Sequence, residues 1–156
     1  MEFAVRLGAL DLRFALDVAT GERVAITGPN GTGKTTILRV LAGLQPIDTG
    51  HVRIDGESVD EPNTHLFVQA EHRNLGYCPQ DLALFDHMSA IENVAFGMRA
   101  TGHTKNKSRE RARELLQRIG LAEQTSSHPG DLSLGQRQRV AIARAVSYTH
   151  LRAHET

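Results

Sequence analysis

The chain has 156 residues, which is enough for one domain with a hydrophobic core and short for two. Its 18 basic and 18 acidic residues leave no formal net charge, so no overall field attracts it to nucleic acid, and we expect no nucleic-acid partner. A single cysteine excludes an internal disulfide, and no apolar run approaches the roughly 18 residues of a membrane-spanning helix, so any work at a membrane requires another chain as anchor.

The N-terminal third is predicted to be rich in β-structure. Apolar and polar side chains alternate along residues 11–18, which is the period-two pattern of a half-buried strand. Residues 1–7, joined to this strand through Gly8, are its candidate hairpin partner. The short apolar run at residues 23–27 is typical of a buried central strand.

A glycine-rich loop follows that run and leads into a predicted helix at residues 35–43. Ile37, Leu38 and Leu41 are interpreted as one helical face, and Gly43 suits the C-terminal cap. Strand, glycine loop and helix in this order indicate an α/β unit.

Two more strands are predicted beyond this unit. Residues 51–55 form one, and residues 74–80 form a buried one that ends at the proline. Cys78 is interpreted as a small apolar residue of that buried strand.

The second half of the chain is predicted to be helical. Ser89 and Glu92 stand at capping-box spacing, so a helix begins there. Residues 108–120 place four apolar side chains on one helical face: Ala112, Leu115, Leu116 and Ile119.

The glycine-rich loop, GPNGTGKTT at residues 28–36, fits the pattern G-x-x-x-x-G-K-[ST]. Glycines let successive N–H groups point inward around a phosphate, and the helix that follows adds its positive end. Lys34 is expected along the β- and γ-phosphates, the Thr35 hydroxyl on Mg²⁺, and Thr36 near the α-phosphate. The predicted binding residues for ATP and Mg²⁺ are Gly28, Pro29, Asn30, Gly31, Thr32, Gly33, Lys34, Thr35 and Thr36.

A phosphate-binding loop alone leaves kinases, GTPases and motor ATPases open. Residues 132–145, LSLGQRQRVAIARA, resemble the signature of ATP-binding cassette (ABC) transporter ATPases, whose usual form has glycine in place of Leu134. Residues 75–85 resemble the glutamine loop of the same family, with Gln80 as the glutamine. The three motifs stand in the family's order, and the resemblance covers residues 1–145.

The resemblance implies an α/β P-loop nucleotide-binding domain with an antiparallel N-terminal β part, a RecA-like core and a helical subdomain at about residues 85–135. It also implies a head-to-tail dimer, in which Ser133, Gly135 and Gln136 close over the γ-phosphate held by the partner's loop. Gln80 would sense Mg²⁺ and the attacking water from a loop that touches the membrane partner. Independently of the family, Ser133 is well placed as a helix N-cap.

The aromatic residue that stacks on adenine in this family is missing from its usual place, which falls near Val5. Phe3 and Phe14 lie in strand patterns instead. Phe14 is interpreted as a core residue rather than as a platform for the base.

The interval from Gln80 to Leu132 is too short for the long coiled coil of the DNA-repair relatives, which favours a transport subunit. The stretch around Gln80 is similar to importer ATPases for molybdate, sulfate, polyamines and sugars, and the short N-terminal hairpin is closest to the molybdate type. The implied partners are a second ATPase subunit and transmembrane permease subunits, which place the chain on the cytoplasmic face of the plasma membrane. Two rivals stay open: a non-transport ABC ATPase, such as a translation factor or an assembly scaffold, and a small-molecule P-loop kinase.

The family's strand with the second Mg²⁺ ligand and the catalytic glutamate is not found after Ala145. Residues 146–156 resemble a translated sequencing-library adapter over their whole length, and His150 and Glu155 stand in the wrong context to replace the missing residues. We therefore interpret residues 1–145 as a nucleotide-binding domain that is incomplete at its C-terminus. Such a chain is expected to bind nucleotide without hydrolysing it.

Overall fold

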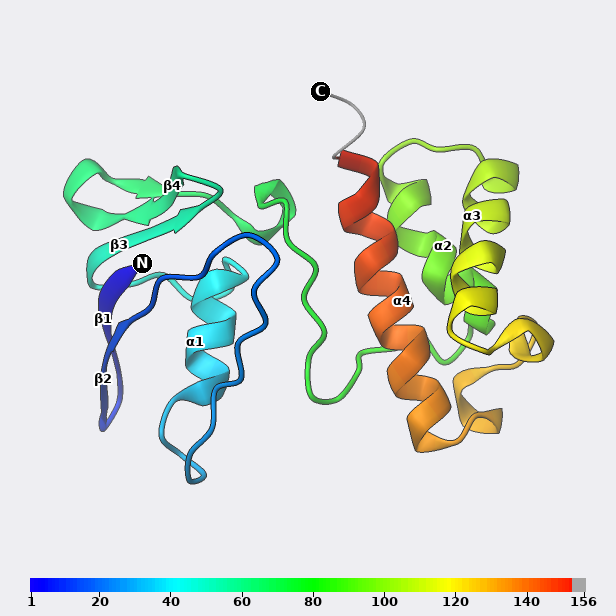
Figure 1. Ribbon diagram of the computed structural model, residues 1–156, viewed down its shortest axis with the longest axis horizontal. Helices are drawn as coiled ribbons and strands as arrows, with labels where there is room; N and C mark the ends of the chain where they lie inside the picture. The colour runs from blue at the N-terminus through cyan, green and yellow to red at the C-terminus, as the bar shows by residue number, and fades with distance from the viewer. Residues whose placement is uncertain (153–156) are drawn as a thin grey trace. The chain divides into compact units, whose positions relative to one another are not determined.

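The computed structural model describes the backbone of residues 1–152 and the side chains of residues 1–147. The chain forms two compact units, Met1–Leu75 and a second that begins at Gly76 (Figure 1). Of the predicted adapter-derived segment, residues 153–156 and the side chains of residues 148–152 lie outside the described residues, and these include the side chains of His150 and Glu155.

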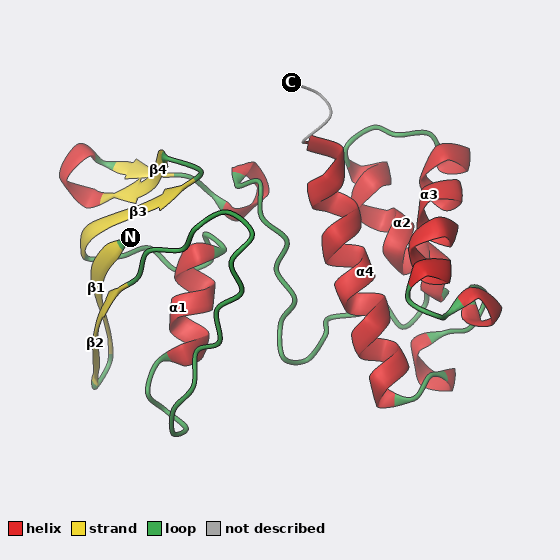
Figure 2. Cartoon of the chain, viewed as in Figure 1, coloured by secondary structure: helices red, strands yellow, loops and turns green. Residues whose placement is uncertain are grey.

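The first unit is built on a five-stranded sheet in the order β2-β1-β3-β4-β5, and every pair in it is antiparallel (Figure 2). The predicted hairpin is confirmed, with Phe3 opposite Phe14 and Val5 opposite Leu12 on the buried face of the sheet. The strands are β1 (Glu2–Leu7), β2 (Leu10–Ala15), β3 (Thr49–Ile54), β4 (Glu57–Glu61) and β5 (Leu66–Phe67).

Backbone geometry explains how β3 fits between its neighbours. Asp55 and Gly56 connect β3 to β4 with φ of 52° and 84°, the left-handed pair that a two-residue hairpin turn requires. Gly50 has φ of 97°, and a side chain on it would collide with the carbonyl of Glu2 in β1. The strand β4 was not predicted, because its polar sequence ESVDE shows little alternation.

Helix α1 (Lys34–Leu41) packs on the buried face of this sheet. Its inner residues are Ile37, Val40 and Leu41, at the i, i+3, i+4 spacing of a helix. The prediction of Leu38 on this face was wrong, since Leu38 is 46% exposed. The core of the unit consists of Phe3, Val5, Leu12, Ile37, Val40, Ile47, Val52 and Val59.

The predicted end of this helix is confirmed at Gly43. Gly43 has φ of 72° and donates its N–H to the carbonyl of Val40 at 3.1 Å. Leu44 donates to the carbonyl of Arg39 at 2.9 Å, which completes the paired bonds of a Schellman cap.

The two predicted buried strands, residues 23–27 and 74–80, are not formed. Residues 23–27 and 74–80 have no strand assignment, and Val24 is 45% exposed. Cys78 is exposed as well, which corrects its interpretation as a buried strand residue. A central strand needs a neighbour to accept its backbone hydrogen bonds, and within residues 1–152 no strand pairs with either segment.

The second unit is helical. It contains α2 (Ala90–Ala100), α3 (Lys105–Arg118) and α4 (Leu134–Arg152), with short 3₁₀ turns at Ala122–Gln124 and Pro129–Asp131. Two further 3₁₀ turns, Pro62–Thr64 and Ala70–His72, belong to the first unit. The buried core of the second unit includes Ile91, Val94, Met98, Leu115, Leu116, Leu121 and Val140.

The predicted capping box at the start of α2 is confirmed. The Ser89 N–H donates to Glu92 Oε2 at 3.1 Å, and the Ser89 hydroxyl donates to the same oxygen at 2.9 Å. These hydrogen bonds lower the pKa of Glu92 because they favour its ionised form. The predicted apolar face of α3 is confirmed too, with Ile119 packed at its edge.

Candidate nucleotide site

The glycine loop of residues 28–33 stands directly before α1. Gly28, Gly31 and Gly33 have φ of 151°, 81° and 92°, and the last two lie in the left-handed region that glycine occupies without strain. Gly33 also lies against the Leu12 side chain of β2, where an added Cβ would be 3.1 Å from a methyl group. The β1–β2 hairpin therefore supports the glycine loop through the contact of Leu12 with Gly33.

The ammonium group of Lys34 folds back onto the beginning of the loop. Its Nζ donates to the carbonyl of Gly28 at 2.8 Å and to the carbonyl of Pro29 at 2.5 Å. A lysine ammonium has three N–H donors, so one is left for a ligand. The Thr32 hydroxyl donates to the Pro29 carbonyl at 2.9 Å and closes the loop further.

The start of α1 offers hydrogen-bond donors that the protein does not use. The first bond of the helix runs from the Ile37 N–H to the Gly33 carbonyl at 3.0 Å. No acceptor within the described residues 1–152 takes the N–H groups of residues 33–36. These donors, the positive end of the helix dipole and the adjacent Lys34 make an anion site in which no acidic side chain occupies the first turn.

Thr35 is exposed at the start of α1 and Thr36 is half-buried beside it. A hydroxyl oxygen is a ligand that Mg²⁺ accepts when phosphate oxygens and waters supply the rest of its octahedral shell. Thr35 therefore fits its predicted role, while among the described residues no cluster of histidine, cysteine and acidic side chains could hold a metal ion on its own.

The opposite end of α1 is held by a buried arginine that the sequence did not reveal. Arg73 is 1% exposed, and its guanidinium donates to the carbonyls of Val40 at 2.6 Å and Leu41 at 2.8 Å. It also donates to the carbonyls of Val59 and Val68, at 3.2 Å and 2.8 Å. Arg73 thus ties the C-terminal end of α1 to the sheet.

A buried carboxylate accompanies this arginine. Asp60 Oδ2 lies 3.9 Å from Arg73 Nη2 and accepts the Ile47 N–H at 3.2 Å. Burial raises the pKa of Asp60, and the N–H of Ile47 and the charge of Arg73 only partly oppose that rise. Burial likewise lowers the pKa of Arg73.

The predicted signature residues come together at the start of α4 in the second unit. Ser133 is confirmed as the N-cap: its Oγ accepts the Gln136 N–H at 3.3 Å, and its own N–H donates to Gln136 Oε1 at 2.8 Å. In these contacts the Ser133 hydroxyl oxygen and the Gln136 side-chain oxygen both act as acceptors. The Ser133 hydroxyl proton, the Gln136 side-chain NH₂ and the N–H groups of Leu134 and Gly135 have no acceptor among the described residues.

The surface at this helix start is open. Nothing lies within 4 Å of a Cβ built on Gly135, and Leu134 is 59% exposed. A ligand can therefore approach the backbone of α4 closely.

Gln80 also lies in the second unit, in an exposed turn closed by a 3.0 Å hydrogen bond from the Leu82 N–H to the Pro79 carbonyl. The glycine loop belongs to the first unit, and Gln80 and the signature residues belong to the second.

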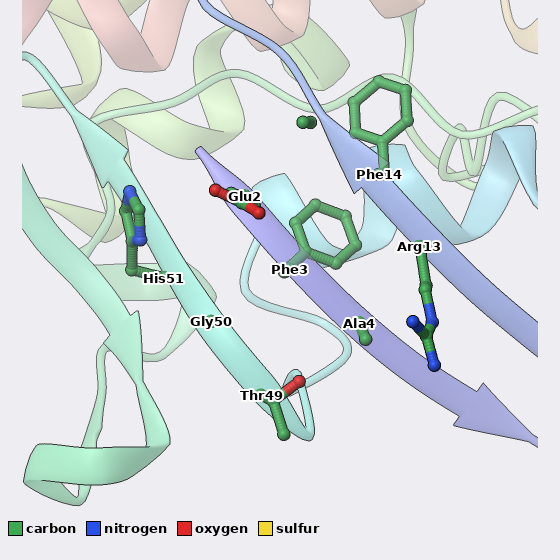
Figure 3. A pocket seen from close by; sticks show the side chains of 9 residues that line it. Glu2, Phe3, Ala4, Arg13, Phe14, Thr49, Gly50 and His51 are labelled. Atoms are coloured by element: carbon green, nitrogen blue, oxygen red, sulfur yellow. The ribbon is translucent and has the colours of Figure 1, made fainter.

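A shallow hollow of about 550 Å³ lies over β1, β2 and β3, with Glu2, Arg13, Phe14 and His51 around it (Figure 3). None of residues 28–36 lines it, so it is separate from the glycine loop. Phe14 is half-buried and packs against the edge of the core, with its ring centroid 5.8 Å from that of Phe3.

The expected position for the adenine-stacking residue, Val5, is only 1% exposed and cannot present a face to a base.

A glycine loop that leads into α1, with Lys34 as the first residue of that helix, and a second open helix N-terminus at α4 define a nucleotide-binding domain of the P-loop type. A sequence profile described as ABC transporter matches residues 12–150, and the chain belongs to this family.

The chain is similar to several curated ATP-binding proteins. It is 46% identical over 133 residues to the spermidine/putrescine import ATP-binding protein of Pasteurella multocida, an alignment that covers 85% of this chain and 34% of that protein. It is 44% identical over 131 residues to the lipoprotein-releasing system ATP-binding protein of Chromohalobacter salexigens, covering 84% and 55%. The chain thus spans about a third to a half of the length of these relatives.

The fold is similar to a solved dimeric ATP-binding cassette in a post-hydrolysis state bound to ADP and phosphate. The TM-score is 0.74 at 29% identity, and the match covers 94% of this chain and 67% of the other. The predicted family and its fold class are therefore confirmed, although the parallel strands of the predicted RecA-like core are not formed within residues 1–152.

Proposed function

We propose that this chain is the ATP-binding part of a transporter subunit that uses ATP to drive solute across a membrane. The observation that carries the proposal is the group of unused donors at the start of α1, namely the N–H groups of residues 33–36 and the third N–H of Lys34. A triphosphate is the ligand whose charge and length suit such a row of donors. The relatives, which are named as ATP-binding proteins, support the same ligand.

We propose that the residues of the glycine loop, Gly28, Pro29, Asn30, Gly31, Thr32 and Gly33, hold the phosphates through their backbone, and that Lys34 binds the terminal ones. Thr35 would hold Mg²⁺, and Gln80 would contribute to the same ion and to the attacking water. When bound, Mg²⁺ neutralises charge on the phosphate oxygens.

We propose that a second ATPase subunit completes the site head to tail. The Ser133 hydroxyl proton, the Gly135 N–H and the Gln136 side-chain NH₂ have no acceptor among the described residues, so they can donate to the γ-phosphate bound by that subunit. The dimeric state of the similar solved cassette supports this arrangement.

We propose permease subunits as the membrane partners, and the cytoplasmic face of the plasma membrane as the location. None of the helices in residues 1–152 is long and apolar enough to span a bilayer. Import is favoured because the similar proteins include import subunits for polyamines and for sulfate or thiosulfate, although one belongs to a lipoprotein-releasing system. The solute is set by the permease, and the molybdate type stays a sequence prediction.

The experiment that tests the proposal is nucleotide binding by the purified 156-residue chain, titrated with Mg²⁺ and a fluorescent ATP analogue. Lys34→Ala should weaken binding by about tenfold or more, because a charge-assisted hydrogen bond contributes about 1.5–3 kcal/mol. Arg39→Ala removes an exposed cation from the last turn of the same helix and should leave the affinity unchanged. Equal affinities of the Lys34→Ala and Arg39→Ala variants for the nucleotide would contradict the proposed nucleotide site.

A further inference from the structure

The turn that carries Gln80 is bonded to the middle of the signature helix α4. Arg144 Nη1 donates to the carbonyl of Ala83 at 2.6 Å, and Arg144 Nη2 donates to the carbonyl of Leu82 at 2.9 Å. The next residue of the helix, Ala145, meets the start of the segment, since a Cβ on Gly76 would lie 2.9 Å from the Ala145 carbonyl oxygen. The segment therefore lies against α4 before Gln80 and is hydrogen-bonded to it after Gln80.

The backbone that Arg144 holds is in an unusual conformation. Leu82 and Ala83 have φ of 62° and 44°, in the left-handed region that residues with a Cβ adopt rarely. Such a conformation persists only where its surroundings fix it. The two carbonyls point to one guanidinium, and its Cζ also lies 5.4 Å from the centre of the Phe85 ring.

The far end of the segment has a separate anchor on α2. Asn93 is fully buried; its Oδ1 accepts the Phe85 N–H at 2.8 Å, and its Nδ2 donates to the carbonyls of Phe85 at 3.1 Å and Met88 at 3.0 Å. This anchor begins after the strained pair. The side-chain hydrogen bonds that fix the backbone of Leu82 and Ala83 consequently come from α4 rather than from α2.

The same helix holds the facing wall of a nearby hollow. A cavity of about 300 Å³ has Asp81 to Leu84 on one side and Pro129 and Gly130 on the other. Arg137, one of its lining residues, donates to the carbonyls of Pro129 at 3.4 Å and Leu132 at 3.0 Å. Two arginines of α4 thus attach the two walls to one helix.

We infer that Arg144 is a positioning residue, which fixes the backbone after Gln80 to the signature helix so that a displacement of α4 is passed on to Gln80. The importance of this link for ATP use rests on the proposed function of Gln80 and of Ser133. The link itself rests only on the contacts of the second unit.

The test is residue-resolved amide hydrogen exchange by NMR on the 156-residue chain without nucleotide. The reporter is the Leu82 N–H, which is bonded to the Pro79 carbonyl and lies between Gln80 and the clamped carbonyls. Arg144→Ala should accelerate exchange at Leu82 by about tenfold or more, because two charge-assisted bonds are lost. Protected amides in α2 and α3 should exchange as in the parent chain.

Arg139→Ala is the matched control. Arg139 lies on the same helix, and its guanidinium donates to the carbonyl of Ile119 at 2.9 Å instead. This variant should leave Leu82 unchanged. Arg144→Lys keeps the charge and can reach a single carbonyl, so it should give an intermediate rate.

An unchanged rate at Leu82 in Arg144→Ala would overturn the inference, and so would a uniform increase over α2 and α3, which would make Arg144 a general packing residue. If Arg144→Ala does not fold, Arg144→Lys decides in the same way: acceleration confined to Leu82 and its neighbours supports the link, and any other pattern overturns it. Since no nucleotide is present, a failure of the proposed ATP site would appear only in the Lys34 titration.

Discussion

Replacing Arg73 with methionine should destabilise the first unit more than any comparable change of a charged surface residue. Methionine keeps most of the length of the side chain and removes the guanidinium. Four carbonyls, those of Val40, Leu41, Val59 and Val68, then lose their donor in a buried site. Asp60, whose side chain is 2% exposed, loses its partner as well.

The expected loss of stability follows from these lost hydrogen bonds and from the unpaired Asp60. Removing one member of a buried, hydrogen-bonded ion pair costs about 3–5 kcal/mol, because the other charge stays buried without compensation. The control is Arg6→Met, since Arg6 pairs with Asp11 at 3.5 Å with side chains that are 74% and 51% exposed. That change should cost less than about 1 kcal/mol.

The assay is urea denaturation followed by far-UV circular dichroism. With a slope of about 1–3 kcal/mol per molar urea, the loss should lower the midpoint of Arg73→Met by more than about 1 M. The deficit should also grow from pH 4 to pH 7. Burial raises the folded-state pKa of Asp60 and the charge of Arg73 opposes that rise, so losing Arg73 raises this pKa further. The contribution of a group with a raised folded-state pKa is present below the unfolded pKa and is lost as the pH rises through the folded value, so the variant loses more stability than the parent chain as the pH rises.

Equal midpoints for the Arg73 and Arg6 variants would refute this reasoning. The same holds for a deficit of Arg73→Met that shrinks towards neutral pH.

Two further changes test the ends of helices. Glu92→Gln should flatten the pH dependence of stability at the acidic end: the Ser89 bonds lower the folded-state pKa of Glu92, so its contribution is present above the unfolded pKa and is lost as the pH falls through the folded value. Urea midpoints between pH 3 and pH 6 measure this, and an unchanged slope in the variant would contradict it. Gly43→Ala should cost at least about 1 kcal/mol more than Gly56→Ala: both residues have positive φ, but only at Gly43 does the new Cβ meet other atoms, 2.7 Å from Arg73 Nε. Equal losses of stability for the two variants in thermal unfolding would show that backbone strain alone sets the cost, and would contradict the prediction.

Local patterns in the sequence were sufficient for several elements. The capping pair Ser89 and Glu92, the N-cap Ser133 and the helix end at Gly43 were all predictable, because each depends on residues within one or two helical turns. The error at Leu38 is of the same local kind: the i, i+3 position is Val40, and a strict count would have chosen it.

Features that depend on distant parts of the chain were not predictable. The run at residues 23–27 has the composition of a central strand, yet a strand is formed only when a neighbour pairs with it. Arg73 carries no local signal at all, since its acceptors come from α1 and from the residues around β4 and β5. In the candidate site, the sequence supplied the loop residues and the signature residues, while the clamp by Arg144 required the structure.

The position of the Lys34 ammonium gives the loop a property beyond its attraction for phosphate. The carbonyl oxygens of Gly28 and Pro29 carry partial negative charge, and without the ammonium they would repel an incoming anion. Lys34 therefore offsets the charge of these carbonyls within the loop, in addition to its proposed role in binding phosphate. A neutral side chain of the same shape would lose the attraction of the ammonium for an anion, and it would also leave the anion exposed to repulsion by the two carbonyl oxygens. The positive charge at this position should therefore contribute more to anion binding than one hydrogen bond does.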